Sequence, residues 1–188
     1  MNSVLLKECS VISNKEYYAK VNEDIVEASI HYPWINEVYI PKVKPISKVY
    51  EVIVVNKEFI DNTLSIKDDF IYEYSKKVTV IVPTNFPNNH CLIYGGEWID
   101  VKKISYANRH FYPHKSGLNL FCVGVPKSVN DYSNIILENL RTVENMLNAY
   151  ELYQKGEINT LELIAYSHGK EGEKEYERKK RIHKNRIR

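Results

Sequence analysis

The chain has 188 residues, of which 44% are hydrophobic and 27% charged, which is the composition of an ordinary globular protein. The net charge of +2 is unevenly spread: residues 178–188 hold seven Lys or Arg and no acid, so the rest of the chain carries −5. The main body therefore gives no electrostatic reason to bind nucleic acid. No apolar run is long enough for a membrane helix or a signal peptide.

The three cysteines, Cys9, Cys91 and Cys122, are odd in number and lie far apart, and no CxxC pair occurs. This spacing argues against both a zinc knuckle and a redox dithiol. A chain of this length needs no disulfide or metal to stabilise its core. We therefore expect a cytoplasmic protein with reduced thiols and without a bound metal.

The first 30 residues are ambiguous, because "KEYYAKVNEDIVEAS" has the length of a short helix but only a weak apolar face. Four β-like segments follow: "EVYIPKV", residues 49–55, residues 78–82 and "HCLIYG". The connection between the second and third begins with polar residues and ends with the alternating residues Phe70, Tyr72 and Tyr74. This order predicts an antiparallel meander rather than alternating βαβ units.

The next segment, "GGEWIDVKKISYANRHFYPHKSG", shows little periodicity, and we expect an irregular segment there. A loop of this length inside a compact domain is usually either functional or wrongly assigned. After the short apolar run "LNLFCVGV", a helix is predicted from Asp131, as N-cap, to Gly156. Its apolar residues recur at steps of three and four: Tyr132, Ile136, Leu140, Val143, Leu147 and Tyr150. A shorter helix is expected over residues 160–167.

The predicted fold is therefore α+β: a four-stranded antiparallel meander packed on C-terminal helices. Residues 1–168 are expected to form a single domain. Residues 169–188 are first acidic and then basic, and they are expected to form a charged, flexible tail. A docking or nucleic-acid contact is the alternative role for this tail, but it lacks the interleaved aromatic residues that stack on bases.

The clearest candidate for chemistry is Cys122, in "FYPHKSGLNLFC". A free cysteine in an apolar run is often a small buried residue, and this remains one interpretation. The other is a nucleophile, because the polar turn before it brings His114 and Asn119 near in sequence. Their side chains can donate to an oxyanion during acyl transfer, and His114 can also act as a base. A protease-like dyad would need an orienting Asn or Asp, which the spacing does not select.

Two further site types receive less support. A metal site would need His110 and His114 with a third ligand, Cys122 or His90, brought in by folding. A nucleotide site is not indicated, because the chain has no Gly-rich motif that would cradle phosphates. We therefore expect neither a metal nor a cofactor.

The order of these elements resembles the ubiquitin-conjugating enzyme fold. That family carries a His-Pro-Asn tripeptide, a Gly-bearing turn, and a thioester-forming Cys eight residues after the Asn. The segment "YPHKSGLNLFC" aligns with this motif without a gap, so that Tyr112, Pro113, His114 and Cys122 take the His, Pro, Asn and Cys positions. Upstream, Phe86-Pro87 resembles the start of the family's Tyr-Pro-x-x-Pro-Pro turn.

The resemblance covers roughly residues 38–155 and includes departures. His114 replaces the Asn, His90 and Cys91 stand where the second prolines would be, the Trp after the Cys is missing, and a first helix is not obvious. Such departures are more typical of divergent bacterial members. Several of those lie in antiphage operons, notably cyclic-oligonucleotide signalling systems, where they attach a nucleotidyltransferase through its C-terminus to targets.

The resemblance implies an acyltransferase in which Cys122 carries the C-terminus of a partner as a thioester and passes it to a lysine. Its implied partners are the protein that is conjugated, such as a nucleotidyltransferase, and a separate activating enzyme. His114 and Asn119 would stabilise the oxyanion. Neither a membrane nor nucleic acid is an expected partner. The rival interpretation is a non-catalytic interaction module on the same fold, with Cys122 packed in the core.

Overall fold

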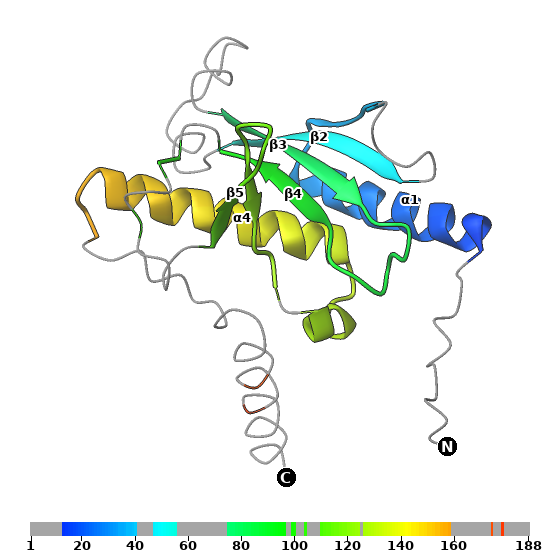
Figure 1. The fold of residues 1–188 in the computed structure, drawn as a ribbon. Coiled ribbons are helices and arrows are strands. Elements are labelled where there is room, and N and C mark those ends of the chain that lie inside the picture. Colours follow the sequence, from blue (N-terminus) through cyan, green and yellow to red (C-terminus); the bar gives the residue numbers. More distant parts are fainter. Residues whose placement is uncertain are drawn as a thin grey trace.

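The computed structural model describes residues 13–40, 47–55, 75–96, 99–100, 104, 110–124, 126–158, 174 and 178 (Figure 1). Its elements in chain order are α1 (Asn14–His31), β1 (Ile35–Glu37), β2 (Lys48–Val55), β3 (Ser75–Val82), β4 (Leu92–Gly95), β5 (Phe111–Pro113), β6 (Asn119–Phe121), η3 (Pro126–Asp131) and α4 (Ile135–Gln154). The α+β class with an antiparallel sheet is confirmed. None of the helices within the described residues is both long and apolar enough to cross a membrane.

Within the part of the chain that the structure describes, the sheet has six strands in the order β1-β2-β3-β4-β6-β5, and all neighbours are antiparallel. The predicted number of four strands was too low, because β5 and β6 lie in the "irregular" segment and the run after it. Each has three residues, too few for a period-two pattern to show. The first predicted strand was also misplaced, since β1 ends at Glu37, where the predicted segment begins.

Helix α1 begins with a capping box that the sequence analysis missed. Ser13 Oγ accepts from the Glu16 backbone N–H, and Glu16 Oε2 accepts from the Ser13 backbone N–H at 3.0 Å. The buried face of the helix includes Asp24 as well as apolar residues, which explains why its apolar pattern looked weak. The segment that the sequence left ambiguous therefore forms a helix, α1.

Helix α4 matches the predicted C-terminal helix with a shifted start. Its N-cap is Asn134, whose Oδ1 accepts from Leu137 N at 2.8 Å, whereas Asp131 belongs to the preceding η3. The predicted stop is confirmed, because Gly156 adopts a positive φ of 72° just after the helix. The predicted helix at 160–167 lies outside the described residues, as does the tail apart from 174 and 178.

A single cluster of buried residues joins the sheet to α1 and α4, which cover one of its faces (Figure 1). Alternate strand residues point into it, as the period of two requires: Val52, Val54, Val78, Val80, Val82, Ile93, Phe111 and Phe121. The helices contribute Val21, Ala28, Ile136, Leu140, Val143 and Leu147, among others. The packing of the C-terminal helix on the sheet is therefore confirmed.

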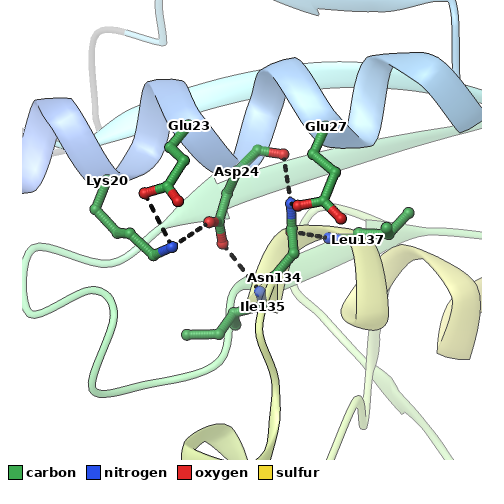
Figure 2. A network of polar contacts seen from close by, with 7 residues as sticks. All are labelled: Lys20, Glu23, Asp24, Glu27, Asn134, Ile135 and Leu137. Carbon is green, nitrogen blue, oxygen red and sulfur yellow. Dashed lines mark hydrogen bonds and ion pairs between the residues drawn. The ribbon is translucent and has the colours of Figure 1, made fainter.

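A polar network ties α1 to the first turn of α4 (Figure 2). Asp24 Oδ2 accepts from Ile135 N at 2.9 Å, and its Oδ1 lies 2.9 Å from Lys20 Nζ. Asn134 Nδ2 donates to the Asp24 backbone oxygen at 2.9 Å and to Glu27 Oε2 at 3.0 Å. A carboxylate at a helix N-terminus satisfies an otherwise unpaired N–H and interacts well with the helix dipole.

Candidate functional site

The hairpin formed by β5 and β6 decides which residues face Cys122. Its register pairs Phe111 with Phe121, and one step further Cys122 N donates to the His110 carbonyl oxygen at 2.9 Å. Cys122 therefore lies at the open end of the hairpin, directly opposite His110. Side chains of directly opposed residues share one face of a sheet, with Cβ atoms typically about 5 Å apart.

The two faces of this hairpin have different surroundings. Phe111 and Phe121 point inward, with ring centroids 5.3 Å apart, and Phe111 also contacts Tyr150 of α4. Because side chains alternate along a strand, Cys122 and His110 belong to the face turned away from the helices. Cys122 is partly exposed there, while His110 is buried.

The environment of Cys122 keeps its thiol protonated at neutral pH. Burial is the largest influence and raises the pKa of Cys122, while a hydrogen bond from the Gly124 backbone acts in the lowering direction. Cys91 is more deeply buried and its pKa is also raised, mainly by burial. Cys122 is therefore the more accessible of the two described cysteines, and it needs a base to become a nucleophile. Cys9 lies outside the described residues.

His114 lies at the other end of the hairpin. Its backbone N–H donates to Leu118 O at 2.9 Å, its Nδ1 lies 2.9 Å from Ser116 Oγ, and its ring contacts Tyr94 edge-on at 5.1 Å. From the Leu118 position to Cys122 is four strand residues, or about 13 Å. The gap-free alignment with the family motif therefore does not place these two side chains opposite each other, whereas the strand register does so for His110.

Asn119 is turned into the core. It is buried, and its Nδ2 donates to the Gly96 carbonyl oxygen at 2.6 Å. An odd separation of three residues along the strand sets it on the opposite face from Cys122. The amide of Asn119 is thus used to fix the end of β4 against β6.

A second polar cluster lies against the backbone just after Cys122, and the sequence analysis missed it. His90 Nε2 lies 3.0 Å from Ser128 Oγ, and His90 Nδ1 lies 2.9 Å from Asn139 Nδ2. Asn139 is 0% exposed and its Oδ1 accepts from Cys91 N at 2.8 Å. One sequence signal existed: Asn139 sits in the apolar stripe of α4, three residues after Ile136, where a polar side chain needs buried partners.

The arrangement resembles a Ser-His-Asn triad in distances but not in proton positions. Because Asn139 Oδ1 accepts from Cys91 N–H, its amide nitrogen faces His90 and donates to Nδ1. The proton of neutral His90 then resides on Nε2 and is donated to Ser128 Oγ. His90 in this state cannot accept the Ser128 proton, so the cluster does not make Ser128 a nucleophile.

Within the described residues, no three His, Cys, Asp or Glu side chains gather as metal ligands would. The chain matches no protein-family model, no curated protein and no solved structure. The residues and their geometry are therefore the basis for any functional proposal.

Proposed function

We propose that this protein is an acyl carrier of the ubiquitin-conjugating type, acting through a thioester on Cys122. The observation that carries the proposal is the position of Cys122: partly exposed, at the end of β6, and directly opposite a histidine in an antiparallel hairpin. The element order supports the family resemblance, since α1 precedes the sheet and the short η3 and long α4 follow the cysteine.

His110 takes the role of proton acceptor in this proposal. The thiol of Cys122 is protonated at neutral pH because burial raises its pKa, so acyl transfer requires a nearby base. A neutral imidazole has an unprotonated ring nitrogen that can accept a proton, and histidine is the side chain that most often acts as a general base. Register favours His110 over His114, which the sequence motif had suggested.

The reaction consists of two acyl transfers. In the first, the Cys122 sulfur attacks the carbonyl carbon of an activated C-terminus; the bond to the activating group breaks, and the thiol proton passes to the imidazole. In the second, a lysine amine attacks the thioester and the carbon–sulfur bond breaks, while the proton that the amine nitrogen loses passes through the imidazole to the leaving Cys122 sulfur. The Gly124 backbone N–H lies near the sulfur and can donate to the oxyanion that forms in each step.

The partners in this proposal are a protein with a conjugated C-terminus, such as a nucleotidyltransferase of an antiphage signalling system, and a separate activating enzyme. The reaction requires a reduced thiol, which supports a cytoplasmic location in this proposal.

A non-catalytic interaction module on the same fold is the second candidate. It is favoured by the raised pKa of Cys122 and by Asn119, whose amide is used within the core. In that case Cys122 is a packing residue just after the end of β6.

A direct test uses the full chain and a synthetic glycine-ending peptide thioester. Transthioesterification onto Cys122 would add the peptide mass to the intact protein and release the donor thiol, and an excess of a thiol reducing agent such as dithiothreitol would remove the adduct by a second exchange. Cys122→Ala should abolish the adduct and Cys122→Ser should give one that resists reducing agent. Cys91→Ala is the matched control and should retain the adduct, since Cys91 is buried. A folded protein that forms no adduct on Cys122, even with excess donor, would favour the interaction module.

A further inference from the structure

The backbone that follows Cys122 is held by a side chain from a distant part of the chain. A Cβ built on Gly124 would lie 2.9 Å from His90 Nε2 and 3.0 Å from Ser128 Oγ. His90 precedes β4, whereas Gly124 and Ser128 follow β6 and belong to the connection that leads through η3 into α4. The His90 imidazole therefore lies closely against the Gly124 backbone, in the space that the Cβ of any other residue at position 124 would occupy.

His90 is itself fixed in place by buried groups. Its Nδ1 accepts from Asn139 on α4, and the Asn139 amide is held in turn by the backbone N–H of Cys91. The ring of His90 also contacts Tyr132 edge-on, with centroids 5.7 Å apart. Both ring nitrogens are engaged, one by Asn139 and one by Ser128, so the ring orientation is determined on both sides.

The two ends of this chain of contacts are the core helix α4 and the residue two positions after the candidate nucleophile. A rigid second layer of side chains is what keeps a reactive group in productive geometry, since a displacement of about 1 Å can lower a rate by orders of magnitude. Holding Gly124 fixes the direction of its N–H relative to the Cys122 sulfur.

We propose that His90 is a positioning residue for Cys122: it clamps Gly124 and Ser128 so that the Gly124 N–H stays directed at the sulfur and at the acyl oxygen of the thioester. This inference rests on the proposed thioester function for its purpose, but the clamp itself can be tested without any acyl transfer. It gives His90 a role distinct from His110, which faces Cys122 directly.

Removing the clamp has two consequences with opposite signs. The segment after Cys122 loosens, so a small alkylating reagent reaches the sulfur more easily. Acyl transfer should become slower, because the Gly124 N–H no longer has a fixed direction. A simple loss of fold stability would instead expose both described cysteines.

The experiment measures alkylation of the native full chain by iodoacetamide, quantified at each cysteine by mass spectrometry across pH. In His90→Ala we expect Cys122 to react about tenfold faster at neutral pH than in the parent protein, because its sulfur is more accessible, while Cys91 remains protected. Ser128→Ala, which removes only the acceptor of the His90 Nε2 proton, should shift Cys122 in the same direction by less. His90→Gln should restore most of the parent behaviour, because its amide can still donate to Ser128.

His31→Ala is the matched control, since His31 is an exposed histidine at the end of α1. If Cys91 becomes labelled together with Cys122 in the His90 and Ser128 variants, the cluster only stabilises the fold and the proposal is wrong. Unchanged labelling of Cys122 in both variants would also overturn it. Altered labelling of Cys122 alone supports the clamp, even where the peptide thioester gives no adduct, in which case only the proposed acyl transfer fails.

Discussion

Replacing Asp24 is expected to weaken the contact between α1 and α4 more than any other single change in the polar network of Figure 2. Asp24 is 1% exposed, and its carboxylate accepts from the first backbone N–H of α4 while lying 2.9 Å from Lys20 Nζ. In Asp24→Ala that N–H loses its acceptor in a place that water does not reach freely, and α4 loses a negative charge at its N-terminus.

The expected decrease in the free energy of unfolding follows from the loss of this hydrogen bond and the loss of this charge. A hydrogen bond to a charged group contributes about 1.5–3 kcal/mol, and a charge at a helix terminus about 0.3–1 kcal/mol. Lys20 is 27% exposed and can turn toward water, so its lost ion pair adds less than about 1 kcal/mol. We expect Asp24→Ala to lower the free energy of unfolding by about 3 kcal/mol, a large part of the 5–15 kcal/mol of a typical domain. Asp24→Asn keeps an acceptor and should cost about 1 kcal/mol.

Urea unfolding at neutral pH, followed by circular dichroism, would measure the effect. With a slope of about 2 kcal/mol per molar, Asp24→Ala should lower the midpoint by about 1.5 M without a change of slope. Glu23→Ala is the matched control, because Glu23 pairs with the same lysine but is 69% exposed, and its midpoint should barely move. A midpoint for Asp24→Ala equal to that of Glu23→Ala would refute the assignment of Asp24 as the link between the helices.

Three further outcomes are expected. Asn119→Ala should lower the free energy of unfolding by about 2 kcal/mol, because the buried Gly96 carbonyl loses its hydrogen-bond donor. Adduct formation with the peptide thioester, per folded molecule, should persist. A variant that keeps full stability but forms no adduct would instead favour a role for Asn119 in stabilising the oxyanion. His110→Gln should slow adduct formation with the peptide thioester more than His114→Ala does, and the reverse order would favour the motif alignment over the strand register. Burial, and then the hydrogen bond to a glutamate, raises the pKa of Tyr32 above the value of about 10 in an unfolded chain. The unfolded state therefore releases the Tyr32 proton at a lower pH than the folded state does. The contribution of this hydroxyl to the free energy of unfolding should be fully present below about pH 10 and should decrease above it. Urea midpoints measured between neutral and alkaline pH should show this decrease, and it should be less steep in Tyr32→Phe.

The sequence alone was sufficient for the elements with long, regular patterns. The alternating runs of β2 and β3 and the apolar stripe of α4 each span several periods, so local spacing reveals them without knowledge of their partners. The stop at Gly156 was also readable, because only a residue that tolerates positive φ ends a helix in this way. Helix α1 had a readable start at Ser13, but Asp24 on its buried face concealed its amphipathic character.

Only the tertiary structure decided which groups surround Cys122. A three-residue strand has no detectable period, so the register that sets His110 opposite the cysteine, and His114 at the far end, exists only once β5 and β6 pair. The His90 cluster joins residues from the segment just before β4, from η3 and from α4, which lie far apart in the chain, and its hydrogen bonds form only where the folded core brings them together. Spacing along the chain identified the cysteine, and long-range packing determined its neighbours.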